Sequence, residues 1–147
     1  MYIRNFAALI AVCFLSLLAL TAHAQRQPVP AIDYINESWP RADGKPLTEQ
    51  QVRQGIMRAV ETHKAERGYP WKIESNADGN LVASVVVRGK HIVRVSITNT
   101  ATNFTVKYHS SVDMKAAKEG SDWVVHPFYN RWVGDLVKAI KDELARA

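Results

Sequence analysis

Residues 81–110 read LVASVVVRGKHIVRVSITNTATNFTVKYHS, and this stretch decides the fold class. Apolar and polar residues alternate along most of it, and β-branched and aromatic residues are frequent. Successive side chains of a strand point to opposite faces of a sheet, so this alternation is typical of strands with one buried face. Turn residues at 89–90 and 99–102 divide the stretch. We therefore predict three consecutive antiparallel strands.

A fourth strand is predicted at 69–74, and a turn cluster at 76–80 separates it from the next one. In each strand, every second residue is expected to face the core. These residues are Tyr69, Trp71 and Ile73, then Leu81, Ala83, Val85 and Val87, then Val93, Val95 and Ile97, and finally Phe104, Val106 and Tyr108. A two-residue turn at 89–90 would send Val93 to the other face. We therefore predict an odd-numbered loop or a bulge there.

The register of the last two strands depends on the loop between them. A four-residue loop at 99–102 keeps both apolar sets on one face and pairs Val95 with Val106. The same register places Arg94 directly opposite Lys107 on the open face. Two like charges in this position repel each other mildly.

Two helices are predicted on either side of the strands. Thr48 and Gln51 have the spacing of a capping box, and an apolar stripe follows them as far as a stop at Gly68. Pro127 suits the first turn of a second helix, with His126 at its cap. One face of this second helix carries Tyr129, Trp132, Val133, Leu136, Ile140 and Leu144.

Together these patterns predict an α+β fold of two layers. A four-stranded antiparallel meander, with a fifth short strand at 123–125 as an option, carries the N-terminal and the C-terminal helix on one face. The residues expected to be buried together are Ile56, Val85, Val95, Val106 and Leu136. Trp71, Trp123 and Trp132 are also assigned to the core, because each brings a large apolar surface to a small domain. The alternative is that some of them line a ligand cleft.

The first 24 residues are interpreted as a cleavable signal peptide. Arg4 precedes an apolar run at 6–20, and Ala22-His23-Ala24 has the small-residue pattern of a cleavage site. The run is shorter than the ~20 residues that span a membrane, so we expect no transmembrane segment after cleavage. The single cysteine, Cys13, lies inside the run and follows Val12, which does not suit lipid attachment. A periplasmic location is predicted, because a mature chain without cysteine suits that compartment.

The prolines of residues 25–46 predict a linker, since Pro28, Pro30, Pro40 and Pro46 interrupt any regular element. A mostly mobile arm is expected, with Trp39 as its anchor. The remaining residues, 47–147, are interpreted as one domain.

The open face of the predicted sheet is the main candidate binding surface. It is expected to carry the basic residues Lys72, Arg88, Arg94, Lys107 and His109, with Glu74 as the only acid. The formal net charge of the chain is +5, which permits an anionic partner. We predict a shallow site for an anionic envelope component or an acidic protein. The alternative is that these side chains are simply solvated.

Catalytic and metal-binding patterns are weak in this sequence. The histidines have no H-x-x-x-H spacing and no cysteine to join them, so we expect neither a metal nor a cofactor. Ser110 or Ser111 could be imagined as a nucleophile and His126 as its base, with Asp113 or Asp122 to orient the histidine, but no G-x-S-x-G motif supports this. There is no strong basic run, and no nucleic-acid partner is expected. The favoured function is a non-enzymatic binding or envelope-maintenance module, and the alternative is a small hydrolase-like enzyme that uses His126.

Three segments carry a resemblance to a known family, namely ERGYPW at 66–71, VRGKH at 87–91 and HPFYNRWV at 126–133. The last one resembles an ending of the form I-H-x-x-Y-N-x-W-V. Its matching positions are Val125, His126, Tyr129, Asn130, Trp132 and Val133. Over 47–145 the chain resembles a family of small exported proteins and lipoproteins of proteobacteria whose function is uncharacterised. The resemblance implies no activity, and this chain departs from the lipoproteins in lacking a usable cysteine.

Overall fold

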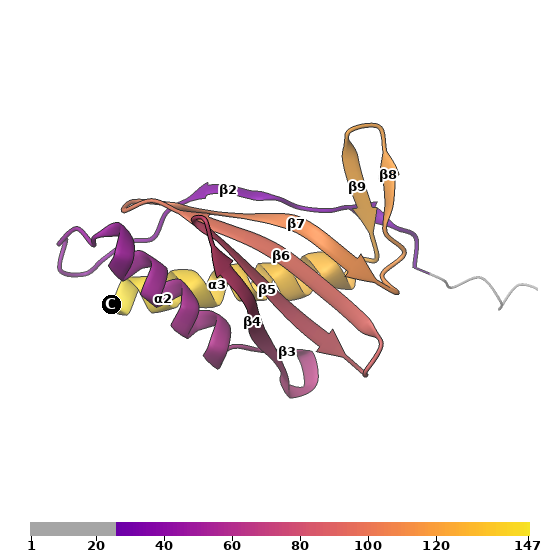
Figure 1. The fold of residues 1–147 in the computed structure, drawn as a ribbon, viewed down its shortest axis with the longest axis horizontal. Coiled ribbons are helices and arrows are strands. Elements are labelled where there is room, and N and C mark those ends of the chain that lie inside the picture. Colours follow the sequence, from indigo (N-terminus) through magenta and orange to yellow (C-terminus); the bar gives the residue numbers. More distant parts are fainter. Residues whose placement is uncertain (1–25) are drawn as a thin grey trace, which may run out of the picture.

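The computed structural model of the chain describes residues 26–147 (Figure 1). The predicted signal peptide at 1–24 lies outside the described residues. The described part has an α+β fold with two α-helices and antiparallel sheets, as the alternating and helical patterns predicted. None of the helices within 26–147 is long and apolar enough to cross a membrane.

The strands form two sheets. The larger sheet has the order β2-β7-β6-β5-β4-β3, and the smaller one has the order β1-β9-β8. The strands are β1 (Val29–Pro30), β2 (Tyr34–Glu37), β3 (Lys64–Ala65), β4 (Tyr69–Ala77), β5 (Asn80–Val87), β6 (His91–Asn99), β7 (Phe104–Val112), β8 (Ala117–Glu119) and β9 (Asp122–Val125). The β8–β9 hairpin projects from the body of the molecule (Figure 1).

The prediction of a four-stranded sheet is wrong in its strand count. Strands β4 to β7 form the predicted meander, but β2 and β3 extend its two edges to six strands, and the sheet curls. These edge strands have only four and two residues, too few for an alternating pattern to be recognised. The optional strand at 123–125 corresponds to β9, which belongs to the smaller sheet.

The helices begin close to the predicted positions. They are α2 (Glu49–Thr62) and α3 (Phe128–Arg146), and a 3-10 turn, η2 (Glu66–Gly68), follows α2. The predicted capping box is present, since the Gln51 N–H donates to Thr48 Oγ1 at 3.2 Å and the Thr48 N–H donates to Gln51 Oε1 at 2.9 Å. Helix α2 ends at Thr62 rather than at Gly68. The cap position of α3 is Pro127 rather than His126, but the His126 side chain does serve that end, because its Nδ1 accepts the Phe128 N–H.

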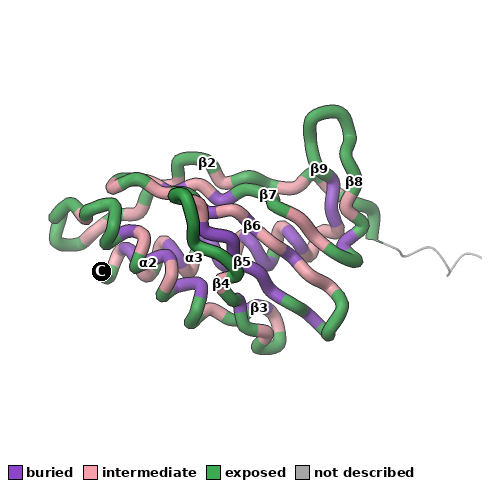
Figure 2. Tube along the Cα trace, in the orientation of Figure 1, coloured by how far each residue is buried: buried purple, intermediate pink, exposed green. Residues whose placement is uncertain are grey.

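The core lies between the helices and one face of the larger sheet. Figure 2 shows buried residues gathered where α2 and α3 meet the strands. The five residues expected to share the core are all buried in one cluster: Ile56, Val85, Val95, Val106 and Leu136. Trp71 and Trp132 also belong to this cluster. Trp123 does not, because it lies on the projecting hairpin with 36% of its surface exposed.

The turn between β5 and β6 has the predicted odd length. Its three residues, 88–90, pair Val87 with His91 and keep Val93 opposite Val85 on the core face. Arg88 and Gly89 adopt left-handed conformations, with φ of 55° and 69°. Arg88 is therefore a turn residue and is not on the open face of the sheet.

The predicted register between β6 and β7 is wrong by two residues. Asn99 pairs with Phe104, so the loop spans 100–103, and a bulge follows between Arg94 and Val95. Arg94 consequently pairs with Ser110, whereas Lys107 pairs with Ser96. A shift of two leaves every side chain on its face, so alternation alone could not decide the register. The loop is closed by Thr100, whose Oγ1 accepts the N–H groups of residues 102 and 103.

The N-terminal segment, residues 26–46, differs from the mobile linker that its prolines predicted. Strand β1 pairs with β9, and β2 pairs with β7. Asn130 fixes the chain between these strands, because its Oδ1 accepts the Ile32 N–H at 2.9 Å and its Nδ2 donates to the Pro30 carbonyl at 2.8 Å. Trp39 packs on Phe104 with ring centroids 6.1 Å apart. Proline is tolerated in such edge strands, so it does not exclude them.

Candidate functional site

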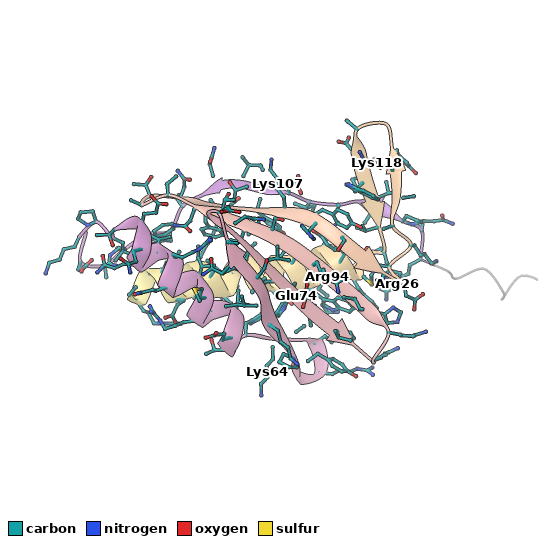
Figure 3. The ribbon with its side chains drawn as sticks, in the orientation of Figure 1. Arg26, Lys64, Glu74, Arg94, Lys107 and Lys118 are labelled. Carbon is teal, nitrogen blue, oxygen red and sulfur yellow. The ribbon has the colours of Figure 1, made fainter. Side chains whose placement is uncertain are left out.

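The open face of the sheet carries less free positive charge than the sequence suggested. Arg94 Nε donates to Glu74 Oε2 at 2.8 Å, and this bond is the main reason why the pKa of Glu74 is lowered. Figure 3 shows these two side chains close together, with Lys107 apart from them. The predicted side-by-side pair of Arg94 and Lys107 is therefore wrong, because the loop at 100–103 shifts the register by two residues and the bulge in β6 shifts Arg94 by one more.

Two other predicted binding residues, Lys72 and His109, lie near that pair, since Lys72 shares a cross-strand row with Arg94 and His109 helps to lower the pKa of Glu74. His109 is exposed, and its Nδ1 lies 3.0 Å from Ser96 Oγ. Lys72 is exposed on β4, in register with Ser84. Near the end of the face, Val86 and Val112 are 44% and 49% exposed. The open face thus combines a neutralised pair, separate cations and apolar side chains, and it has no single cationic site.

A different site forms where four segments meet at the β5–β6 turn. A cavity of about 200 Å³ lies between η2, this turn, the residues after β7 and the start of α3. Its lining residues are Glu66, Arg67, Val87, Arg88, His91, Asp113, Met114, His126, Phe128 and Trp132. The sequence had singled out Arg88, His126 and Trp132 for separate reasons. All three segments that carry the family resemblance contribute to this lining, Arg67 among them, and Asp113 was considered as a partner for His126. The sequence gave no sign of Met114.

The inner wall of the cavity is apolar. Val87, Met114 and Trp132 are buried, with exposed fractions of 5%, 2% and 3%. Phe128 stacks on Trp132 with ring centroids 5.8 Å apart and the planes 23° from parallel. The Nε1 of Trp132 is buried and makes no hydrogen bond, so its indole ring acts as an apolar surface. This wall suits the hydrophobic part of a small molecule.

The two acids of the cavity already have cationic neighbours. Glu66 Oε2 lies 3.7 Å from Arg131 Nη1. Asp113 Oδ2 lies 3.6 Å from Lys90 Nζ and 3.3 Å from His91 Nδ1. Arg67 and Arg88 are different, because within residues 26–147 neither guanidinium forms an ion pair or a side-chain hydrogen bond. The cavity therefore has an excess of positive charge.

His126 is held at the cavity by backbone contacts. Its Nδ1 accepts the Phe128 N–H at 3.2 Å, and its own N–H donates to the Met114 carbonyl at 2.7 Å. Burial lowers the pKa of His126, and the positive charges of Lys115, Arg26 and His91 lower it further. The imidazole is therefore neutral near pH 7, and its surroundings favour a negative charge.

Three lining residues have a backbone conformation that is rare for side chains other than glycine. Arg67, Arg88 and Asp113 have φ values of 62°, 55° and 55°. Residues held in such conformations cost roughly 1–3 kcal/mol each, and they cluster at functional sites. Their presence around one cavity supports a role for it beyond stability.

Four of the six positions that match the family-like ending, His126, Tyr129, Asn130 and Trp132, have two kinds of role. His126 and Trp132 line the cavity. Asn130 fixes the N-terminal segment through backbone hydrogen bonds. Tyr129 is fully buried, its hydroxyl makes no hydrogen bond, and burial raises its pKa strongly. Two of these four residues therefore shape the cavity, and the other two hold the fold around it.

Four of the lining side chains, Glu66, His91, Asp113 and His126, are of types that can act as general acids or bases. No serine, threonine or cysteine is among its lining residues. Ser111, one of the imagined nucleophiles, instead has its Oγ 3.0 Å from the Tyr108 hydroxyl. Within residues 26–147 there is also no group of three or more side chains arranged to hold a metal ion.

Comparison of the chain with known proteins finds no matching family model, no matching curated protein and no matching solved structure. The resemblance of the ending at 125–133 to exported proteobacterial proteins therefore stays a prediction.

Proposed function

We propose that this protein is a non-enzymatic binding module that holds a small molecule in the cavity at the β5–β6 turn. The observation that carries this proposal is the combination of an apolar wall with two arginines that lack partners among residues 26–147. Binding pockets typically pair a mostly apolar lining with a few well-placed polar groups. The absence of a hydroxyl or thiol nucleophile among the lining residues favours binding over the hydrolase-like alternative that uses His126.

This site is a better candidate than the open face of the sheet. Arg94 is paired with Glu74, and Lys107 lies elsewhere on the face, so an anionic envelope component or acidic protein would find no concentrated charge there. The cavity instead offers enclosure, apolar surface and charge together. We also propose that the protein acts in the periplasm, as the signal-like residues 1–24 predict.

The test is a screen of small molecules, neutral and charged, against the exported chain labelled with ¹⁵N. The proposal expects some of them to shift the amide signals of Arg88 and Phe128 and the indole signal of Trp132. The Lys107→Gln variant is a matched control, because Lys107 is exposed on the sheet face, and it should respond as the natural sequence does. Shifts confined to the sheet face, or no shifts at all, would reject the cavity as the binding site.

A further inference from the structure

We infer that the ligand of this cavity is a small amphipathic carboxylate, with its head on Arg67 and Arg88 and its apolar body against Phe128, Met114 and Trp132. This inference rests on the proposed function and adds the chemical class of the ligand. It is argued from the charges, the backbone and the wall of the cavity.

The charged side chains of the cavity favour a ligand with one anionic group. Glu66 and Asp113 are each within 4 Å of a cation of the protein itself. Arg67 and Arg88 have no such neighbour among the described residues, and the positive charges of Arg26 and Lys115 lie close to His126, so the site has positive charge left to bind an anion. A guanidinium presents N–H groups in a planar fork, which matches the two oxygens of a carboxylate.

The backbone at the two arginines indicates that their side chains are needed. Each has a positive φ and stands immediately before a glycine that also has a positive φ, Gly68 or Gly89. Glycine would adopt the arginine positions without steric strain. No atom lies within 4 Å of the place where a Cβ would be on either glycine, so these turns are open and are not shaped by close packing. The turns set this conformation, as they do at Asp78 and Gly79 between β4 and β5, but they do not require arginine, so the residue type at these two positions is what a ligand would explain.

The wall of the cavity limits the apolar body. Its residues are two stacked rings, one thioether and one valine side chain. The volume of about 200 Å³ is below the ~300–1,000 Å³ of pockets that hold drug-sized molecules. A single aromatic ring or a short aliphatic chain would fill it. The structure thus favours ligands the size of phenylacetate or hexanoate over long-chain lipids.

The experiment compares matched ligands by calorimetry and by the Trp132 indole signal of the exported chain. Phenylacetate and hexanoate are compared with the neutral amides phenylacetamide and hexanamide, and with phenyl phosphate and inorganic phosphate. The protein variants are Arg67→Gln, Arg88→Gln and the double variant, with Lys72→Gln and Lys107→Gln as controls. Arg67→Gly and Arg88→Gly remove the charge without adding backbone strain, so folding of these variants is secure.

The carboxylates are expected to bind at least ~10-fold more tightly than their amides. Each arginine variant should lose about 10-fold in affinity, and the two lysine variants should lose none. Amides that bind as well as the acids would overturn the inference and leave the binding function intact. Tighter binding of phenyl phosphate would replace the carboxylate with a phosphate head and overturn the stated class. If no member of the panel moves the Trp132 signal, the inference is wrong, while the broader screen still decides the function.

Discussion

The N-terminal segment and the meander of β4 to β7 reach the same sheet by different means. In the meander, each strand pairs with its neighbour in sequence, and a local alternation of residues marks its buried face. In the N-terminal segment, by contrast, β1 and β2 pair with β9 and β7, and the bonds of Asn130 join residues 98 and 100 positions apart. Local pattern therefore describes the meander well. It cannot reveal a segment whose structure comes from distant partners.

The largest effect is expected from removal of residues 26–44. The deletion takes away β1, β2, the bonds to Asn130 and the packing of Trp39 on Phe104. We expect a loss of at least ~3 kcal/mol in the free energy of unfolding, because several hydrogen bonds and a large apolar contact disappear. Ile35→Ser is the control, since Ile35 is 50% exposed and its change should matter little. A deletion variant with an unchanged Tm would show that the segment is only a linker.

A single side chain should reproduce part of that effect. Asn130→Ala removes both bonds to the N-terminal segment, and we expect it to lower the free energy of unfolding by about 1–3 kcal/mol. Asn130→Asp keeps the acceptor for the Ile32 N–H and loses the donor to the Pro30 carbonyl. Its free energy of unfolding should therefore lie between those of Asn130→Ala and the natural sequence. Urea unfolding measures the order. Equal stability of all three proteins would contradict the role given to Asn130.

The capping box of Thr48 and Gln51, which the local sequence predicted, can be compared with the distant bonds of Asn130. Thr48→Ala removes one half of the capping box of α2 and should cost about 1 kcal/mol. Thr48→Ser keeps the oxygen and should restore most of that loss. The cost is expected to be smaller than that of Asn130→Ala, because only one helix end is affected. A larger cost at Thr48, measured by urea unfolding, would reverse the ranking of local and distant contacts.

The smallest expected effect is a pH dependence of stability that comes from His63 and His126. These histidines have neighbours in the meander and in the N-terminal segment, respectively. Burial lowers the pKa of His63 and of His126 below the ordinary value of 6.5, and Arg26 of the N-terminal segment adds to the effect at His126. The carbonyl of His63 accepts the N–H of Trp71 in the meander. Above pH 6.5 both rings are neutral whether the chain is folded or unfolded, so this contribution to stability is complete.

Below that pH the unfolded chain takes up protons first, and the stability contributed by the two neutral rings is lost as the pH falls further. We therefore expect the free energy of unfolding to decrease between about pH 7 and pH 5.5. The variant with His63→Gln and His126→Gln should have a flatter profile over that range. If the free energy of unfolding of the protein with its natural sequence is constant from pH 7 to pH 5.5, neither the His63 ring nor the His126 ring is held neutral.

The fold could be predicted from the sequence as far as local patterns extend. The alternation in 81–110 identified the buried faces, and Thr48 with Gln51 marked the start of α2. The register of β6 and β7 was missed, because a shift of two residues conserves every face. The cavity was missed for a different reason. Its residues come from four separate segments between 66 and 132, and only the folded chain brings them together.

The central claim is that a small molecule occupies the cavity, and the methionines offer the most direct test of it. Within residues 26–147, Met114 lies in the cavity wall, whereas Met57 lies on α2 with its Sδ 3.5 Å from Asn76 Nδ2. The protein, carrying ¹³C-labelled methionine methyl groups, is mixed with phenylacetate, and nuclear Overhauser effects from the ligand ring are recorded. The account predicts an effect to the Met114 methyl group and none to that of Met57. An effect to Met57 alone, or to neither methyl group for every ligand that binds, would contradict it.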